Sequence, residues 1–66
     1  MPSTTIKYFA YSHLPPVLQD VSRTVAEVAN YMEAYLTDGP EKSAGMRKLL
    51  EAKDCFVRAR LEDLPK

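Results

Sequence analysis

Hydrophobic residues recur through the first half of the chain at alternating steps of four and three positions. They are Leu14, Leu18, Val21, Val25, Val28, Met32 and Tyr35. This repeat places their side chains on one side of an α-helix that packs against a neighbour. The pattern predicts a first helix over about residues 15–36. Pro15 and Pro16 suit its opening turn, where a missing amide hydrogen costs little, and Ser12 is a candidate cap.

A tight reversal is expected at residues 37–40. Gly39 can take a left-handed conformation after the last helical turn, and Pro40 can open the next helix but cannot continue the first. The second helix is predicted over about residues 40–63, with Asp38 or Gly39 as its cap. Its apolar residues are Met46, Leu49, Leu50, Phe56, Val57, Leu61 and Leu64.

These elements predict an all-α fold, an antiparallel two-helix hairpin with a short amino-terminal arm over residues 1–13. The 66 residues leave room for one domain only. No apolar run approaches the roughly 18 residues that span a bilayer and no secretory leader is evident, so we expect a soluble cytoplasmic protein. Because Cys55 is the only cysteine and His13 the only histidine, we expect neither a disulfide nor a metal site.

The apolar arc of the first helix is wide, about 160 degrees, and a single partner helix cannot cover it. Small folds without disulfides or metals commonly associate in order to bury enough surface. We therefore predict a homo-oligomer. Gly45, Ala52 and Ala59 form a stripe of small residues that another helix could approach closely, although alanines also simply favour helix formation.

Nine basic and nine acidic residues give a formal net charge of zero. This balance argues against a DNA- or RNA-binding protein, which normally carries a basic surplus. Lys53 and Arg60 nevertheless fall within the apolar face of the second helix. Either a carboxylate of Asp20, Glu27 or Glu62 pairs with them, or they line a polar cavity between subunits that holds an anion.

The arm carries an aromatic cluster of Tyr8, Phe9 and Tyr11, with His13 close behind. Such rings can stack on nucleobases, but they could equally fold back over the exposed helical face. His13 has no nucleophile or carboxylate in a catalytic pattern near it, which favours a capping or packing role over general-base chemistry. Since no phosphate-binding glycine loop or acid–base pair is present either, we expect no enzyme activity.

Four segments carry a resemblance to a known family. They are residues 8–15 (YFAYSHLP), 18–22 (LQDVS), 39–42 (GPEK) and 47–59 (RKLLEAKDCFVRA). The chain resembles the phage Acb/Tad helical-hairpin family, the anti-CBASS and anti-Thoeris sponges that sequester cyclic nucleotide messengers of bacterial immune systems. The resemblance covers most of the chain, and the segment that begins LLEAKD is its most specific part.

The resemblance implies a homo-hexamer in the cytoplasm of the infected host that binds cyclic di- and trinucleotides without catalysis, metal or cofactor. For the dinucleotide, it implies that Tyr8 or Tyr11 stacks on a base while Arg23 meets a phosphate, and His13 joins these candidates. For the trinucleotide, it implies a site where subunits meet. The candidates there are Arg58, Arg47 and Lys53. The residues alone also allow an alternative, a non-catalytic adaptor whose wide apolar face binds another protein.

Overall fold

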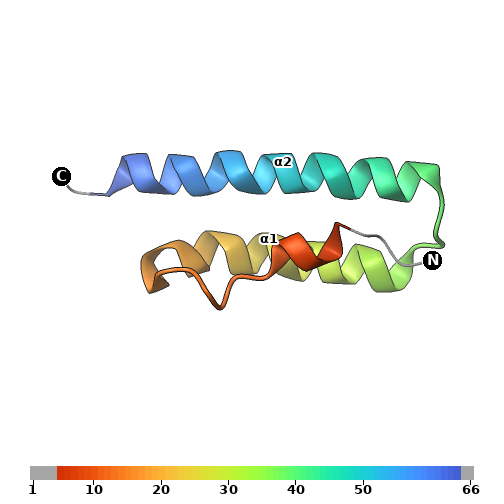
Figure 1. Cartoon of the computed structure of the whole chain (residues 1–66), viewed down its shortest axis with the longest axis horizontal. Coiled ribbons are helices and arrows are strands. Elements are labelled where there is room, and N and C mark those ends of the chain that lie inside the picture. Colours follow the sequence, from red (N-terminus) through yellow and green to blue (C-terminus); the bar gives the residue numbers. More distant parts are fainter. Residues whose placement is uncertain (1–4, 65–66) are drawn as a thin grey trace.

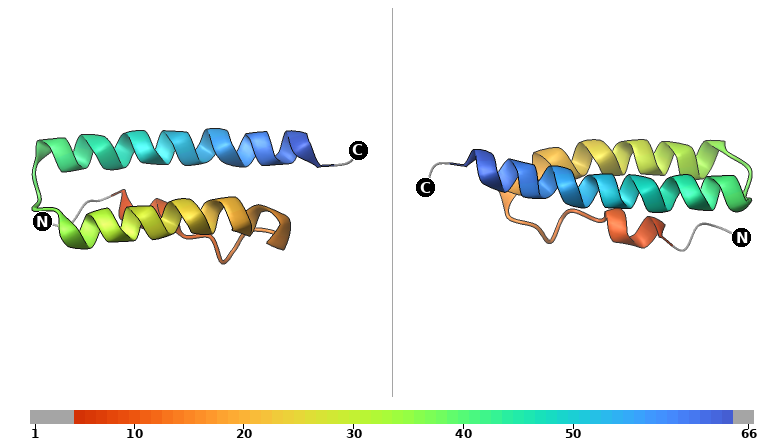
Figure 2. Two further views of the ribbon diagram at one scale, coloured as in Figure 1. Left: turned by 180° about the vertical axis from the view of Figure 1, so that it is seen from behind. Right: turned by 90° about the horizontal axis from the view of Figure 1, so that it is seen from above.

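The computed structural model describes residues 5–64, which form three helical elements. The 3-10 helix η1 spans Ile6–Phe9, α1 spans Pro16–Tyr35 and α2 spans Pro40–Asp63. Helices α1 and α2 lie side by side and antiparallel, and the arm that contains η1 runs along one face of the pair (Figures 1 and 2). The predicted two-helix hairpin is therefore confirmed, with helix bounds within one residue of those expected. Residues 1–4 of the predicted arm lie outside the described residues.

The reversal between the helices differs from the expected left-handed turn at Gly39. The φ angle of Gly39 is 172°, which is extended backbone, and the glycine precedes α2 without any side-chain cap. The amine of Lys42 reaches back across the turn and donates hydrogen bonds to the carbonyl oxygens of Glu33 (2.9 Å) and Leu36 (3.2 Å). Carbonyls at the end of a helix need such partners, and here a lysine supplies them in place of a left-handed residue.

The start of α1 also differs from the prediction, because Ser12 does not cap it. Pro15 occupies the capping position with no side-chain hydrogen bond, and Pro16 begins the helix without an amide hydrogen that would need one. The Gln19 side chain instead donates to the carbonyl oxygen of Leu14 at 2.8 Å. This bond ties the end of the arm to the first turns of α1.

The core is small and lies mainly between the arm and the two helices. Its buried hydrophobic residues are Phe9, Leu18, Val25, Ala26, Ala29 and Met46. Phe9 is the largest of them and is only 2% exposed. Of the two roles considered for the aromatic arm, Phe9 therefore takes the covering one. No helix within residues 5–64 combines the length and the apolar composition needed to cross a bilayer.

The buried stripe of α1 is rotated from the one that the apolar repeat indicates. Ser22, Ala26 and Ala29 are buried, whereas Val28 and Met32 remain 42% and 38% exposed. The rotation arises because α1 has two neighbours, and the arm covers a side on which the sequence places mainly small residues. The carboxyl-terminal part of the predicted apolar face of α1 is left uncovered, as expected for a face too wide for one partner helix.

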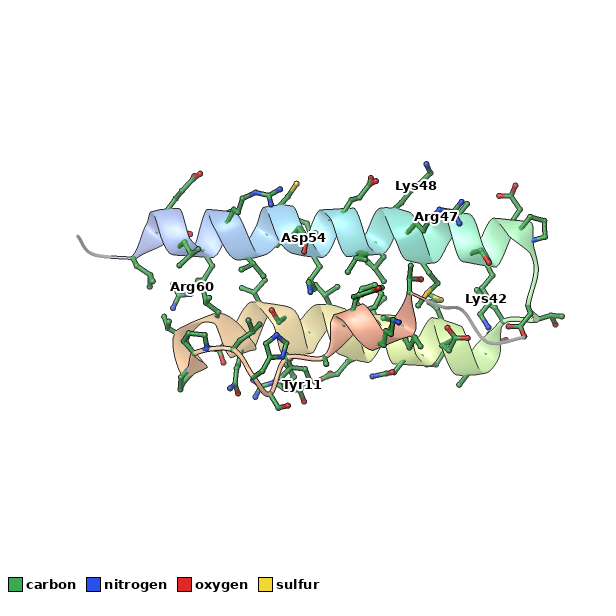
Figure 3. All side chains as sticks on the ribbon, viewed as in Figure 1. Tyr11, Lys42, Arg47, Lys48, Asp54 and Arg60 are labelled. Carbon is green, nitrogen blue, oxygen red and sulfur yellow. The ribbon has the colours of Figure 1, made fainter. Side chains whose placement is uncertain are left out.

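The two basic residues on the apolar face of α2 bind backbone carbonyls, not the carboxylates of Asp20, Glu27 or Glu62. The Lys53 amine donates to the carbonyl oxygen of Tyr8 at 2.9 Å, and the Arg60 Nε donates to that of Val17 at 3.4 Å. Arg60 lies near the open end of the hairpin and Lys42 near the turn, and both point toward α1 (Figure 3). Lys53 thus links α2 to the arm, and Arg60 links α2 to the start of α1.

Candidate functional site

A hollow lies between the arm and the adjoining side of α1. The arm lines it with Ile6, Lys7, Phe9, Ala10, Tyr11 and Ser12, and α1 lines it with Ala26 and Asn30. Its volume is about 390 Å³, within the roughly 300–1,000 Å³ typical of small-molecule sites. The lining residues include two aromatics, Phe9 and Tyr11, together with a lysine and an asparagine. They can therefore contact a flat ring together with an anionic or hydrogen-bonding group.

Three contacts hold the wall of this hollow in place. Phe9 is buried in the core, Lys53 donates to the Tyr8 carbonyl, and Gln19 donates to the Leu14 carbonyl. The Lys53 side chain is 13% exposed and also lies 3.8 Å from the Asp54 carboxylate. A wall that is already ordered loses less conformational entropy when a ligand binds.

The structure separates the aromatic candidates of the arm. Tyr11 is half-buried, packs against the core and lines the hollow. Tyr8 is exposed, and the Lys7 amine lies 5.2 Å from the centroid of its ring, within the range of a cation–π contact. His13 is also exposed, and it is not part of the lining. Tyr11 and Lys7 are thus brought to the hollow, while Tyr8 and His13 lie outside its lining.

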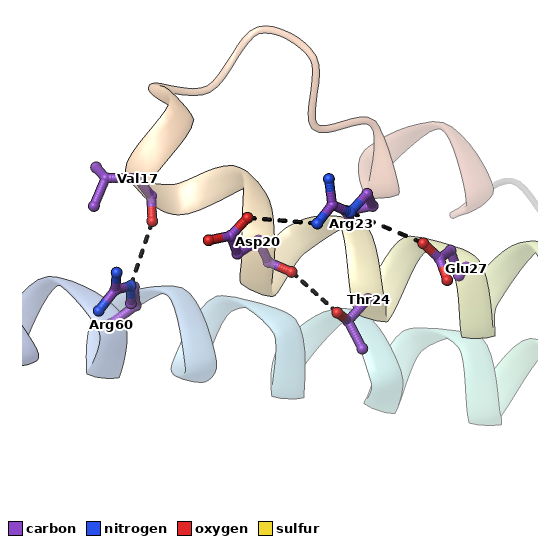
Figure 4. Close-up of polar contacts among 6 residues, drawn as sticks. All are labelled: Val17, Asp20, Arg23, Thr24, Glu27 and Arg60. Atoms are coloured by element: carbon purple, nitrogen blue, oxygen red, sulfur yellow. Dashed lines mark hydrogen bonds and ion pairs between the residues drawn. The ribbon is translucent and has the colours of Figure 1, made fainter.

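Arg23 lies next to the hollow on the same side of α1. It precedes Ala26 and Asn30 by three and seven positions, a spacing that keeps side chains on one side of a helix. Its guanidinium is 3.5 Å from the Asp20 carboxylate and 4.0 Å from that of Glu27 (Figure 4). Because all three side chains are exposed, these ion pairs are weak and a phosphate could replace them.

The remaining basic candidates occupy a different part of the arm side. Lys53 and Arg58 line a second, smaller hollow of about 200 Å³ with Leu14, Asp54 and Val57. A guanidinium nitrogen of Arg58 lies 3.3 Å from the Cys55 sulfur, so the side chain is only lightly held. Arg47 is exposed about three helical turns earlier on α2 and does not line this hollow.

Sequence reasoning missed three polar residues that the fold places prominently. Lys7 and Asn30 line the first hollow, and only the path of the arm brings them together. Lys42, itself buried, forms a charged cluster at the turn, where its amine lies 2.7 Å from the Asp38 carboxylate and 3.0 Å from that of Glu33. The four-residue spacing of Asp38 and Lys42 was the available signal for this pair.

The Lys42 cluster shifts the protonation equilibria of its members. The hydrogen bond from Lys42 lowers the pKa of Asp38 below its ordinary value. The hydrogen bond to Asp38 raises the pKa of Lys42 above its ordinary value, although burial acts in the opposite direction. Both groups are held in their charged forms, which suits a structural link across the turn more than proton transfer.

Among the described residues, no three histidine, cysteine or acidic side chains gather where they could hold a metal ion. The polar and aromatic residues that line the two arm-side hollows are Lys7, Phe9, Tyr11, Ser12, Asn30, Lys53, Asp54 and Arg58. Comparisons with protein-family models, with curated proteins and with solved structures found no match for this chain.

Proposed function

We propose that this chain captures cyclic oligonucleotide messengers without cleaving them, acting in the cytoplasm of a phage-infected bacterium. The observation that carries the proposal is the hollow between the arm and α1, which Tyr11, Lys7 and Asn30 line and which Arg23 adjoins by its spacing on α1. A nucleotide consists of a flat base, which stacks on an aromatic ring, and a phosphate, which pairs with a cation. This side of the hairpin offers both kinds of group within a few residues of each other.

One hollow of this size suits one nucleotide, so a cyclic dinucleotide requires two copies of the chain. In a symmetric assembly each copy contributes the same ring and the same cation to one half of a symmetric ligand. Self-association, as the hexamer that the resemblance implies, is therefore part of the proposal. It also agrees with the uncovered apolar side chains of α1 and α2.

A cyclic trinucleotide would use the second group of cations. Arg58 and Lys53 share one small hollow on α2, and Arg58 is exposed with a sulfur atom as its one hydrogen-bond acceptor among the contacts described. A guanidinium that is exposed and lightly held can bind a phosphate with two parallel hydrogen bonds. We place Arg58 first in this site, with Lys53 beside it and Arg47 as a further contributor from another copy.

The test is to incubate the pure protein with cyclic di- and trinucleotides, remove the free ligand, denature the protein by heat and identify what is released. Intact messenger in the released fraction supports capture, whereas linear products would show cleavage. If no cyclic nucleotide is retained above the level of a non-binding protein of the same size, the proposed function is wrong.

The stacking residue is tested by calorimetry on matched variants at position 11. Tyr11→Phe keeps the flat ring and should bind the dinucleotide nearly as well as the wild type. Tyr11→Leu keeps apolar bulk against the core but has no ring to stack, so its affinity should fall roughly tenfold or more. Tyr8→Ala and His13→Ala should have little effect. A large loss at Tyr8 with none at Tyr11 would move the stacking role to Tyr8.

Arg58→Ala should weaken trinucleotide binding at least about tenfold while the assembled mass stays unchanged. Arg47→Ala should weaken binding by a smaller factor, because Arg47 does not line the hollow that holds Arg58. Wild-type trinucleotide affinity in Arg58→Ala would remove Arg58 from the site.

The second candidate function is that of a non-catalytic adaptor, and the observation that favours it is the apolar groove between α1 and α2 near the turn. Such a groove can take a helix of another protein. Sizing of the purified chain separates the two functions, because a stable monomer that retains no cyclic nucleotide would favour the adaptor.

A further inference from the structure

The face of the helix pair opposite the arm, here called the bare face, is apolar along its length. Its defining residues are Val21, Val28 and Met32 on α1 and Gly45, Leu49 and Phe56 on α2. The view from behind shows α1 and α2 with the arm on their far side, and no described segment covers this face (Figure 2). A stacked pair, Tyr31 and Tyr35, flanks it with ring centroids 5.4 Å apart.

Two hollows mark the bare face. One of about 390 Å³ lies near the turn, between Met32 and Gly45, and one of about 370 Å³ lies toward the open end beside Phe56. Apolar atoms make up nearly all of both linings. The charged residues that border these hollows lie at the two ends of the face. They are Glu41 and Lys42 near the turn and Asp20 near the open end.

A polar residue of the bare face, Thr24, has a hydrogen-bond partner within its own helix. Its hydroxyl donates a 3.0 Å hydrogen bond to the carbonyl oxygen of Asp20 one turn earlier (Figure 4). A hydroxyl that already has a local acceptor can be buried at low cost. A partner could therefore cover this surface without leaving a polar group unsatisfied.

The chain as a whole exposes more area than a compact monomer of its mass. The chain exposes 4856 Å², whereas a compact monomer of 7.5 kDa is expected to expose about 4,250 Å². The excess of about 600 Å² is close to the roughly 800 Å² that each partner buries in a standard protein interface. An interface of this order would bring the chain to the burial of an ordinary small domain.

We propose that the bare face packs against the same face of a second copy of this chain. A two-fold pairing of identical faces opposes no like charges in its centre, because the charged residues lie at the ends. Gly45 lines the hollow near the turn, and a methyl group placed there would meet nothing within 4 Å. Exposed apolar side chains such as Phe56 can fill such gaps in a partner. This pairing rests on the self-association that the proposed function requires, and it leaves the arm side open for ligand.

The test measures the mass of the full chain by light scattering and its dissociation constant by sedimentation. Phe56→Ala should raise the dissociation constant at least about tenfold. Tyr8→Ala is a matched control, because Tyr8 is 55% and Phe56 54% exposed but Tyr8 lies on the arm. It should leave the dissociation constant within about twofold of the wild type.

Gly45→Leu is a second variant that tests the same surface independently. A Cβ atom at this position would meet nothing within 4 Å, and leucine is a better helix former than glycine, so the circular dichroism spectrum should stay helical while the assembly dissociates. A wild-type chain that stays monomeric up to its solubility limit would overturn the proposal. So would wild-type mass and affinity in both Phe56→Ala and Gly45→Leu.

The same samples separate this inference from the proposed function. If the wild type assembles and both variants dissociate, yet no cyclic nucleotide is retained, the interface is supported and the sponge is not. If cyclic nucleotide is retained while both variants keep the wild-type mass, the sponge is supported and copies meet through another surface.

Discussion

The two faces of the helix pair differ in whether the chain covers them itself. On the arm side, Phe9 covers two alanines, Ala26 and Ala29, and all three are buried. On the bare face, the larger Val28 and Phe56 stay exposed. A residue's own hydrophobicity therefore does not decide its burial in this molecule. The presence of a third layer decides it, because two helices alone form a single line of contact.

The chemical character of the hollows follows the same division. The arm contributes backbone and polar side chains, so the hollow beneath it has a mixed lining that includes Lys7 and Asn30. The hollows of the bare face have only helix side chains around them and are lined by apolar atoms. Mixed linings suit small polar ligands and apolar ones suit protein surfaces. We accordingly assign ligand binding to one face and association to the other.

The largest expected effect comes from removing the cover on the arm side. Phe9→Ala should lower the free energy of unfolding by about 3–5 kcal/mol, because it deletes the largest fully buried side chain. Urea denaturation followed by circular dichroism measures the change. Tyr8→Ala, one position away and exposed, should cost less than about 1 kcal/mol.

Phe9→Ala could leave too little stability to fold, and Phe9→Leu then provides the measurement. It should cost less than about 1.5 kcal/mol, since it keeps most of the apolar volume. Equal losses at positions 8 and 9 would show that the arm does not cover the helices as described, and the contrast between the two faces would disappear.

A smaller effect is expected from pH, because the ion pair between the buried Lys42 and Asp38 lies at the turn. The lowered pKa of Asp38 contributes stability that is present above its ordinary value of 3.8 and lost as pH falls through the folded-state value. The raised pKa of Lys42 contributes stability that is present below 10.5 and lost as pH rises through the folded-state value. Stability should therefore be flat between about pH 5 and pH 9 and fall on both sides.

Urea midpoints measured across this range test the pH dependence. Asp38→Asn should reduce the loss at acid pH, since the amide cannot be protonated there. Asp63→Asn, at the exposed end of α2, is the control and should leave the acid limb as in the wild type. An unchanged acid limb in Asp38→Asn would contradict the role given to the turn.

The smallest expected change in the free energy of unfolding comes from removing either of two hydroxyl groups of α1. Ser22 is fully buried and its oxygen has no hydrogen-bond partner within the described part of the chain, whereas the exposed Thr24 has one. Ser22→Ala should raise the free energy of unfolding by about 1 kcal/mol, because it removes an unsatisfied polar atom and adds a better helix former. Thr24→Ala should change it by less than about 0.5 kcal/mol. Thermal melts of dilute samples measure both, and destabilisation by Ser22→Ala would contradict the assignment.

The candidate site was only partly predictable. Tyr11 follows from its place in an aromatic cluster near the first helix, and Arg23 was named only through the resemblance. Lys7 and Asn30 are separated by more than twenty positions, and nothing in their local pattern indicates that the arm brings them together. Lys42 looks like an ordinary surface residue of a first helical turn, and it becomes buried because the closed turn places the carbonyl oxygens of Glu33 and Leu36 within hydrogen-bond distance of its amine.

The sequence by itself determined the two helices, their ends and their antiparallel order, because periodicity and the prolines at positions 15, 16 and 40 act over a few residues. Only the tertiary structure decided which face the arm covers, which apolar side chains stay exposed and which polar groups meet around the hollow. Those outcomes depend on contacts between residues distant in the chain, and a choice between two sides of a hairpin leaves no mark in local spacing. The same sequence pattern is compatible with either face, and the burial of Phe9 under this particular path of the arm selects one of them.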